Sequence, residues 1–540
     1  MFEPARSYAH GASEVALIGR TIGEDLERTV ARVPDREALI DVPTGRRLTY
    51  AELDVAVDRV ASGLLAAGLA TGDRVGIWAP NCVEWVLVQY ATAKLGVILV
   101  NINPAYRSHE LHYVLNQSGV RLLIAARSFK TSDYVAMVEE VRPACAALES
   151  VVFLGSPEWD ALGMAEVDRD GLAARAATLG FDDPIKIQYT SGTTGFPKGA
   201  TLSHHNILNN GYFVGALLGY TEEDRVCVPV PFYHCFGMVM GNLGATSHGA
   251  TIVIPAPSFD PAATLRAVHE ERCTSLYGVP TMFIAELALA DFAQYDLSSL
   301  RTWIMAGSPC PVKVMKRVVA EMNMAEVTIM YGMTETSPVS TMTRREDDLE
   351  RRVSTVGTVM PHVEVQIIDP ETGRSVPRGV PGEVCTRGYS VMLGYWDAPD
   401  QTAEAIDAAG WMHTGDLGTM DDAGYVSIVG RIKDMVIRGG ENIYPREVEE
   451  FLYGHPDIDD VQVIGVPDAK YGEELMAWIR LRPGAEPLTA EAVRAFCTGK
   501  LAHYKIPRYV HLVDEFPMTV TGKVRKIEMR ERSVAFLDQR

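Results

Sequence analysis

The segment Tyr189–Gly199, with the sequence YTSGTTGFPKG, has the residue types that bind phosphate. Its glycines let backbone N–H groups approach phosphate oxygens, its Ser and Thr hydroxyls add donors, and Lys198 supplies a point charge. It is not a Walker A loop, because Lys198 is followed by Gly199 and Ala200 and not by Ser or Thr. By itself, a hydroxyl-rich stretch of this kind is a plain surface turn as often as a phosphate cradle.

The elements that must position this segment alternate between helices and strands. Apolar residues at helical spacing follow Tyr50, and buried strands are predicted at Arg74–Trp78 and Val97–Val100. Ser203 and Pro311 stand where two further helices would begin. Other predicted strands are Ile185–Tyr189, Ala250–Pro255, Arg301–Gly307 and Val327–Tyr331. This alternation predicts an α/β fold, with mainly parallel sheets and layered helices in a large N-terminal domain.

The C-terminal region has a different pattern. Its segments become short and glycine-punctuated after about Tyr395. We expect an N-terminal domain of residues 1–432 and a small α+β domain of residues 433–540, because about 100 residues are enough for a domain of their own. The predicted strands of the small domain are Asp460–Val466, Leu475–Leu481 and Tyr509–Val513, and its predicted helices are Glu447–Tyr453 and Thr489–Leu501.

Composition limits the class of protein. With 540 residues, of which 47% are hydrophobic, the chain can bury a large core. Its net charge of −20 disfavours nucleic acid or an anionic membrane as the main partner. Eight dispersed cysteines without a CxxC pair favour a reducing, cytoplasmic location. No apolar run reaches the roughly 20 residues of a membrane span, so we expect no integral membrane segment. The oligomeric state is left open, a homodimer included.

Eight segments together resemble the adenylate-forming superfamily, which contains acyl-CoA and aryl-CoA synthetases, amino-acid-activating domains of peptide synthetases, and luciferases. The chain looks most similar to the fatty-acid–CoA ligases for medium and long chains. The segments follow the family's order and extend over nearly the whole chain. They are Tyr189–Gly199, Pro231–His234 (PFYH), Ala306–Pro309 (AGSP), Tyr331–Glu335 (YGMTE), Gly382–Gly388 (GEVCTRG), Trp411–Gly418 (WMHTGDLG), Gly430–Glu449 and Thr521–Lys526 (TGKVRK).

The resemblance implies an acid:CoA ligase that uses ATP, Mg²⁺ and CoA. A carboxylate is a poor acyl donor, and joining it to AMP turns its oxygen into a stabilised leaving group. The enzyme must hold the nucleotide and place the carboxylate in line with the α-phosphate. CoA then takes the acyl group as a thioester.

The family's nucleotide contacts can be carried over residue by residue. Glu335 would hold Mg²⁺, with Thr194 as a second ligand, and Asp416 would bind the ribose hydroxyls beside Arg431. Each of these segments, taken alone, is also an ordinary turn or capped helix start. The implied ATP and AMP contacts are Thr190, Ser191, Gly192, Thr193, Thr194, Gly195, Phe196, Pro197, Lys198, Gly307, Ser308, Pro309, Tyr331, Gly332, Met333, Thr334, Asp416, Arg431 and Lys523.

The same resemblance makes the C-terminal domain mobile. Lys523 would bridge the substrate carboxylate and the α-phosphate during adenylation, and the domain would then rotate about Lys433 for the thioester step. A basic surface tail is the alternative for residues 498–530, whose net charge is +4. The implied CoA contacts are Arg438, Gly439, Gly440 and Lys505, with Arg508 and Lys526 as further candidates.

Residues around His234 indicate the acid. His234 resembles the gate beside the carboxylate, although a satisfied core histidine is as good an interpretation. The implied acyl pocket comprises Tyr233, His234, Phe236, Gly237, Met238, Met305 and Gly332, which also suit plain core packing. Amino-acid activation is disfavoured because no acidic residue lies between Pro229 and Gly249. We expect a fatty acid of medium or long chain, with an aryl acid as the alternative because GEVCTRG resembles a segment of coumarate ligases.

A luciferase-type oxygenase would share the nucleotide motifs. A non-catalytic nucleotide-binding protein would be expected to lose Lys198, Glu335, Asp416 or Lys523, and all four are present. The catalytic set that we expect is therefore Lys523, Thr334, Glu335 and His234.

Overall fold

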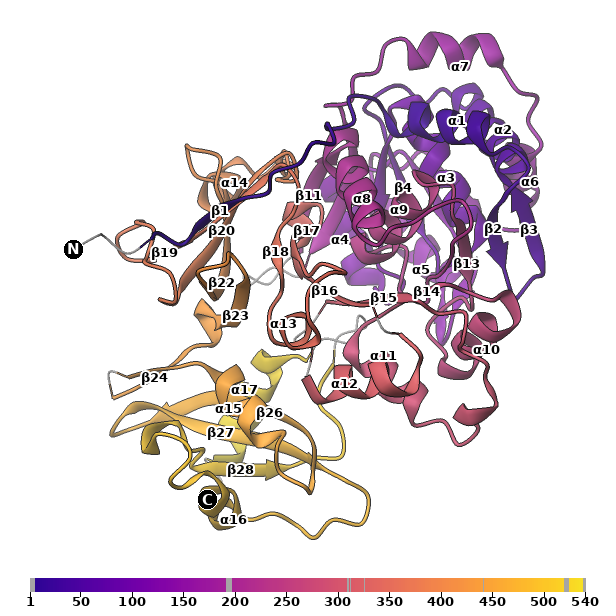
Figure 1. Ribbon diagram of the computed structural model, residues 1–540. Coiled ribbons are helices and arrows are strands. Elements are labelled where there is room, and N and C mark those ends of the chain that lie inside the picture. The colour runs from indigo at the N-terminus through magenta and orange to yellow at the C-terminus, as the bar shows by residue number, and fades with distance from the viewer. Residues whose placement is uncertain are drawn as a thin grey trace. The chain divides into compact units, whose positions relative to one another are not determined.

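The computed structural model describes residues 5–190, 197–307, 310, 312–324, 326–439, 441–518 and 524–537 (Figure 1). The chain folds into two compact units. The large unit comprises Ala9–Val365 and Thr386–His413, and the small unit comprises Met1–Tyr8, Gln366–Cys385 and Thr414–Arg540. The boundary expected between residues 432 and 433 is the position of the hinge about which the C-terminal domain would rotate. This boundary stays a prediction.

A nine-stranded sheet forms one part of the large unit. Its strands run in the order β18-β17-β16-β15-β14-β12-β13-β2-β3. The six strands from β16 to β2 in this order are parallel, and antiparallel strands flank them on both sides. The bounds are β2 (Glu37–Asp41), β3 (Arg46–Thr49), β12 (Arg225–Cys227), β13 (Thr251–Ile254), β14 (Ser275–Gly278), β15 (Thr302–Met305), β16 (Glu326–Gly332), β17 (Val339–Met342) and β18 (Thr358–Val359).

A seven-stranded sheet forms the other main layer, in the order β21-β11-β10-β5-β4-β6-β9. Strands β10, β5, β4, β6 and β9 are parallel, and β11 and β21 extend the sheet antiparallel. The bounds are β4 (Arg74–Trp78), β5 (Ile98–Asn101), β6 (Leu122–Ala125), β9 (Ser150–Phe153), β10 (Pro184–Thr190), β11 (Lys198–Ser203) and β21 (Gly394–Tyr395). The two sheets confirm the expected α/β class.

Helices connect these parallel strands, as parallel pairing requires. Those of the large unit are α1 (Ile22–Arg32), α2 (Tyr50–Ala66), α3 (Val83–Leu95), α4 (Ser108–Ser118), α5 (Tyr134–Val141), α6 (Pro157–Gly163), α7 (Arg169–Ala176), α8 (His204–Leu217), α9 (Gly244–Thr246), α10 (Pro261–Glu271), α11 (Pro280–Leu287), α12 (Val312–Glu321), α13 (Leu349–Ser354) and α14 (Pro399–Ala405). Ser203 caps α8 as predicted, because its hydroxyl accepts a hydrogen bond from the Asn206 N–H at 3.1 Å.

One helix ends earlier than its sequence pattern predicts. We expect the helix after Pro311 to run to Asn323, yet α12 ends at Glu321. Asn323 adopts a left-handed φ of 56°, and its side-chain amide donates to the carbonyls of Ser298 and Leu300 at 3.2 Å each. These tertiary hydrogen bonds replace the next helical turn.

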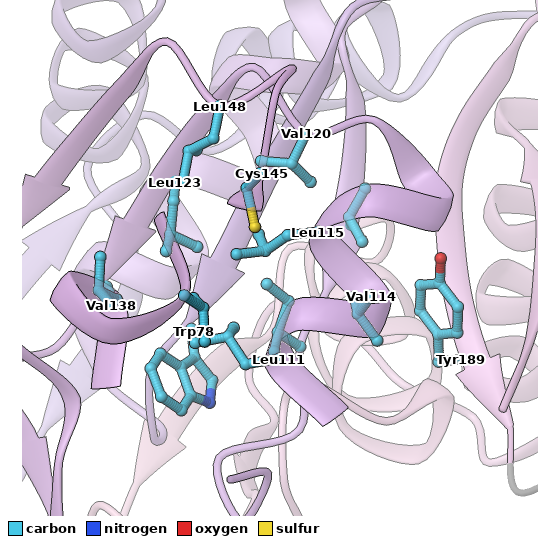
Figure 2. Packing of buried hydrophobic residues seen from close by; sticks show 14 of the residues in the cluster. Trp78, Leu111, Val114, Leu115, Val120, Leu123, Val138, Cys145, Leu148 and Tyr189 are labelled. Carbon is cyan, nitrogen blue, oxygen red and sulfur yellow. The ribbon is translucent and has the colours of Figure 1, made fainter. Parts of the chain in front are cut away.

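The core of the seven-stranded sheet lies between its strands and helices α4 and α5 (Figure 2). Leu111, Val114 and Leu115 recur at i, i+3 and i+4 on α4, so one face of this helix is apolar and is buried against the sheet. The rings of Trp78 and Tyr134 stack with centroids 3.5 Å apart. Burial of this apolar surface holds the sheet and its covering helices together.

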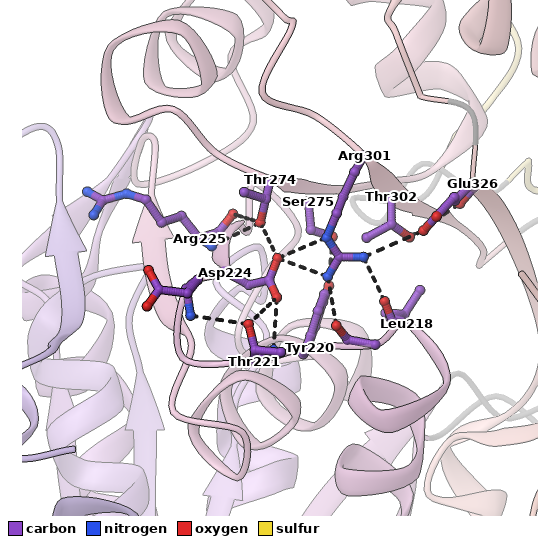
Figure 3. A network of polar contacts seen from close by, with 12 residues as sticks. Leu218, Tyr220, Thr221, Asp224, Arg225, Thr274, Ser275, Arg301, Thr302 and Glu326 are labelled. Atoms are coloured by element: carbon purple, nitrogen blue, oxygen red, sulfur yellow. Dashed lines mark hydrogen bonds and ion pairs between the residues drawn. The ribbon is translucent and has the colours of Figure 1, made fainter. Parts of the chain in front are cut away.

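A polar network fastens the amino ends of strands β12, β14 and β15 in the nine-stranded sheet (Figure 3). Asp224 accepts hydrogen bonds from the Arg301 guanidinium at 2.9 and 3.1 Å and from the Thr274 hydroxyl at 2.7 Å. Arg301 also donates to the carbonyls of Leu218 and Gly219. These hydrogen bonds occupy the amino end of the sheet. A ligand is therefore expected at the carboxyl end.

The small unit contains most of a five-stranded sheet, β1-β19-β20-β22-β23, and a second sheet in the order β25-β24-β27-β26, with β28 beside β27. The strands of these two sheets are β1 (Tyr8–His10), β19 (Val363–Ile368), β20 (Gly382–Gly388), β22 (Met412–Met420), β23 (Val426–Arg431), β24 (Val436–Arg438), β25 (Glu441–Ile443), β26 (Ile458–Asp468), β27 (Gly472–Leu481) and β28 (Tyr509–Leu512). Its helices are α15 (Pro445–Leu452), α16 (Ala490–Cys497) and α17 (Lys526–Leu537).

Within residues 433–540, the strands β24 and β25 and the helix α17 were not expected from the sequence. Strands β24 and β25 are three residues each, which is too short for a period-2 pattern to be recognised. Helix α17 is highly charged, and its buried residues are Met529 and Ser533. The Trp478 indole N–H donates to the Ser533 hydroxyl at 2.9 Å, which fixes α17 against β27.

Two further expectations concern the thiols and the membrane. All eight cysteines are free, and seven of them are buried, as a reducing environment allows. None of the helices in the described residues is both long and apolar enough to cross a membrane.

Candidate active site

Several predicted site residues lie at the carboxyl ends of parallel strands in the large unit. Thr190 ends β10, Met305 ends β15 and Gly332 ends β16. Parallel α/β sheets bind ligands at this end because the loops that follow the strands gather there. These predicted residues of the large unit therefore belong to separate strands, and each of them lies at the carboxyl end of its strand.

Strands β10 and β11 flank the predicted phosphate segment. These strands are antiparallel, and Thr190 pairs directly with Lys198. The Pro197 carbonyl accepts a hydrogen bond from the Tyr113 hydroxyl at 3.1 Å, which holds the start of β11. The residues between, Ser191, Gly192, Thr193, Thr194, Gly195 and Phe196, lie outside the described residues.

Glu335 lies in the short 3-10 helix η4 (Thr334–Thr336) and is only 4% exposed. Its Oε1 accepts a hydrogen bond from the Tyr395 hydroxyl at 2.8 Å, and the Thr190 hydroxyl makes a long contact of 3.4 Å with the same oxygen. A buried carboxylate with hydroxyls around it matches the oxygen ligands that Mg²⁺ prefers. The geometry supports the predicted metal-binding role of Glu335.

Tyr395 is a residue that the sequence analysis missed. Strand β21 pairs with β11, with Ala200 opposite Tyr395. This pairing brings the Tyr395 phenol beside Glu335 and Lys198 of the predicted phosphate site. The Lys198 amine lies 4.9 Å from the centre of the Tyr395 ring. Burial and the neighbouring Glu335 carboxylate raise the pKa of Tyr395, so its hydroxyl stays protonated and donates. Its only signal in the sequence is an aromatic residue after Gly394.

Tyr331 and its neighbours form another group of the implied ATP and AMP contacts. Tyr331 is half-buried at the end of β16, and Gly332 follows where a Cβ would lie 1.8 Å from the Pro338 carbonyl oxygen. Any other residue at position 332 would displace the backbone. Met333 is half-buried, and Gly307 has a φ of 87°. Ser308 and Pro309 lie outside the described residues.

His234 and the residues after it form a compact segment. The Nδ1 of His234 accepts a hydrogen bond from the Phe236 N–H at 3.2 Å, so the neutral ring carries its proton on Nε2. Residues Phe236–Leu243 form a π-helix, η2, a geometry often found at functional sites. Gly237 is required there because a Cβ would lie 2.4 Å from the Pro231 carbonyl oxygen.

The other predicted acyl-pocket residues are mostly buried. Tyr233, Phe236, Met238 and Met305 are each less than one-tenth exposed, whereas Gly332 is exposed. Burial alone suits both a closed apolar pocket and plain core packing, so the pocket stays a prediction.

In the small unit, Asp416 and Arg431 form an ion pair. They are opposite each other on β22 and β23, and the Arg431 Nε donates to the Asp416 carboxylate at 2.9 Å. Asp416 is 8% exposed, and the preceding Gly415 N–H donates to Glu383 at 3.0 Å. The structure therefore brings together the predicted ribose ligand and its predicted partner.

The predicted CoA contacts in the small unit are already paired with carboxylates. Arg438 donates to Glu474 at 2.6 Å and lies over the Tyr471 ring at 4.1 Å. Lys505 is paired with Glu447 at 2.6 Å. The further candidates behave alike, with Arg508 paired to Asp468 at 2.9 Å and Lys526 to Glu449 at 2.6 Å. These long-range partners could not be predicted from the sequence.

Four more predicted residues complete the account of the small unit. Gly439 has a left-handed φ of 61°, and Lys433 is exposed in the short helix η5 (Ile432–Asp434). Gly440 and the predicted catalytic Lys523 lie outside the described residues.

Comparison with known proteins gives consistent matches. The family model described as AMP-binding enzyme matches residues 26–396, and that of the AMP-binding enzyme C-terminal domain matches residues 447–523. The chain is 48% identical to the putative acyl-CoA synthetase YngI of Bacillus subtilis (strain 168), over 96% of this chain and 98% of YngI. It is 45% identical to the mitochondrial medium-chain acyl-CoA ligase ACSF2 of Danio rerio, over 98% of this chain and 90% of that protein.

Among solved structures, the anthranilate CoA ligase AuaEII in complex with anthranoyl-AMP is similar with a TM-score of 0.84. The two chains are 28% identical, and the match covers 96% of this chain and 98% of AuaEII. The fold is therefore shared with an enzyme whose acid is aromatic.

Proposed function

The chain belongs to the AMP-binding enzyme family and is an AMP-forming acyl-CoA ligase, and we propose that the acid it activates is a fatty acid of medium or long chain. The observation that carries this proposal is the apolar segment after His234. Phe236 and Met238 of this segment are buried, and Met305 at the end of β15 is buried as well. Flexible methionines adapt to alkyl chains. The 45% identity to a medium-chain acyl-CoA ligase supports the same class of acid.

In the first proposed step, the acid carboxylate attacks the α-phosphate of ATP, and pyrophosphate leaves. Thr190, Lys198 and Thr334 would bind phosphate oxygens, and Glu335 would hold Mg²⁺, which neutralises charge on the phosphates. His234 would donate its Nε2 proton in a hydrogen bond to the carboxylate. Lys523 would stabilise the negative charge that develops between carboxylate and phosphate.

In the second proposed step, the CoA thiol attacks the acyl-adenylate carbonyl, and AMP leaves. Asp416 would keep the ribose in place through both steps, since a carboxylate accepts hydrogen bonds from two hydroxyls. Arg438, Gly439, Gly440 and Lys505 would meet CoA after rotation about Lys433. ATP, CoA and a small carboxylic acid are the partners that this scheme requires, and the cytoplasmic location stays a prediction.

An aryl acid is the second candidate, because AuaEII is named for anthranilate and shares this fold. The two candidates differ in the shape of the acid that the segment after His234 accepts. An alkyl chain needs a long flexible wall, and an aromatic ring needs a flat slot.

CoA-dependent AMP release would separate the candidates. We would measure it with ATP and Mg²⁺ over straight-chain acids from acetate to stearate, with benzoate, cinnamate and several amino acids. A maximum among acids of about 8 to 16 carbons is expected from the proposal. Activity confined to aromatic acids would contradict it, and AMP release that does not depend on CoA would point to another acyl acceptor.

A further inference from the structure

Lys186 is a buried lysine that the proposed reaction does not use. It lies in the middle of β10, is 2% exposed, and its Nζ has no hydrogen-bond partner among the described residues. Burial lowers the pKa of Lys186 to about 7. A buried amine without an acceptor is costly, so a position of this kind calls for an explanation.

A second unpartnered donor lies beside it. The Lys186 Nζ is 5.1 Å from the centre of the Trp85 ring, and the Trp85 Nε1 also has no partner in the part of the chain that the structure describes. The indole N–H can only donate, and the lysine amine donates in both of its protonation states. No hydrogen bond joins the two groups in the described residues, so each of them is left to donate to an oxygen acceptor.

Among the described residues, the side chains near Lys186 do not supply that acceptor. Asn101 is two positions along the sheet, opposite Gln188, and its amide donates to Gln188 at 2.7 Å. Its Oδ1 is itself buried without a donor, so it is not bonded to Lys186. The remaining charged or titratable neighbour is the buried Cys235 thiol, whose pKa burial raises to about 12.

This pair of donors lies next to the predicted acyl-binding segment. Cys235, which interacts electrostatically with Lys186, directly follows His234, and Phe232 packs against Trp85 with ring centres 5.7 Å apart. Along β10, Lys186 and Thr190 face the same side, because they are four residues apart in a strand. Thr190 contacts Glu335, so the phosphate site and Lys186 are on one face of the same strand.

We propose that Lys186, with Trp85 beside it, binds an oxygen acceptor carried on the acyl chain, so that the enzyme prefers an oxygen-substituted aliphatic acid over the plain one. This inference rests on the proposed function, because it places the acyl chain along the segment after His234. A hydroxyl, a ketone or a second carboxylate shares the chemistry of the required acceptor. A site with buried donors discriminates strongly against a substrate that leaves them unpaired.

The test is a ratio of kcat/KM values for pairs of acids of equal length. Octanoate would be compared with 8-hydroxyoctanoate, 7-oxooctanoate and octanedioate, and the same comparison would be made at 6 and 10 carbons. The three oxygenated acids distinguish a hydroxyl, a carbonyl and a carboxylate as the preferred acceptor. The wild type is expected to favour one oxygenated acid, and Lys186→Met should lower its ratio to the plain acid at least about tenfold.

Two further variants make the result specific. Trp85→Phe keeps the ring and removes one donor, so it should lower the same ratio by about threefold. Thr201→Val is the matched control: Thr201 also has an unpartnered buried hydroxyl, but it pairs with Ile187 and so faces the other side of the sheet from Lys186. This control should leave the ratio within twofold of the wild type.

Three results would overturn the inference. One is a wild type that prefers the plain acid at every length, and another is an equal loss of both activities in Lys186→Met. The third is an unfolded Lys186→Met protein together with an unchanged ratio in Trp85→Phe. If the wild type activates aromatic acids alone, the proposed function fails instead, and the ratio is then measured between 4-hydroxycinnamate and cinnamate with the same criteria.

Discussion

The two compact units place their candidate functional charges in opposite environments. In the large unit, Glu335 and Lys186 are almost fully buried, and the first is held by a tyrosine hydroxyl. In the small unit, Arg438 and Lys505 are partly exposed, and carboxylates already neutralise them. The large unit is thus organised for a ligand in advance, whereas an anion that binds these cations of the small unit must compete with internal partners.

Two lysines that are both paired with carboxylates show how the two units differ in burial. The Lys94 side chain is 6% exposed in the large unit and is paired with Asp54 at 2.7 Å and Asp58 at 2.6 Å. Burial alone would lower the pKa of Lys94, but these two carboxylates outweigh it and raise the pKa. The Lys505 side chain is 20% exposed beside Glu447. Removing one partner from a buried pair costs about 3–5 kcal/mol, whereas an exposed pair contributes about 0–1 kcal/mol.

The comparison is sharpened most by Lys523→Ala in the small unit. Loss of the ammonium should lower acyl-adenylate formation about 1000-fold, because charge developing at the α-phosphate loses its stabilisation. Thioester formation from supplied acyl-AMP should stay within a few-fold. ATP–pyrophosphate exchange and single-turnover thioester formation would be measured, with Lys500→Ala as an exposed control. Equal loss of both half-reactions would show that Lys523 is not specific to adenylation.

The large unit is tested by Glu335→Gln. Removal of the buried negative charge should lower ATP–pyrophosphate exchange about 100-fold and weaken its dependence on Mg²⁺. Tyr395→Phe, which keeps the carboxylate and removes the 2.8 Å hydrogen bond, should lower exchange only about threefold. Mg²⁺ titrations of exchange would check both, and the exposed Glu346→Gln is the control. If Glu335→Gln keeps the Mg²⁺ dependence of the wild type, Glu335 is not the metal ligand.

A smaller effect than that of Glu335→Gln is expected for Asp416→Asn in the small unit. An amide oxygen is a weaker acceptor than a carboxylate, so the KM for ATP should rise about tenfold with a smaller change in kcat. Initial-rate kinetics over a range of ATP concentrations would show this, with exposed Asp422→Asn as the control. An unchanged KM for ATP would remove Asp416 from the nucleotide site and leave its ion pair with Arg431 as purely structural.

Much of the fold could be predicted because its signals are local. The strand Arg74–Trp78 is apolar after its first residue, and Ser203 caps a helix with a hydrogen bond to the third residue of that helix. The ends were less predictable: α12 stops two residues early because Asn323 bonds to a distant loop. Helix α17 escaped notice because its apolar face is narrow.

The sequence by itself determined the family and the order of the nucleotide-binding segments, because each segment is continuous in the chain and needs particular residue types. The tertiary structure alone decided what surrounds them. Thr190 and Glu335 are 145 residues apart, and Glu335 and Tyr395 are 60 apart, yet all three meet because β11 pairs with both β10 and β21. Within the described residues, the lack of an acceptor for Lys186 is likewise a property of burial, since the packing of other segments around β10 decides which partners a side chain has.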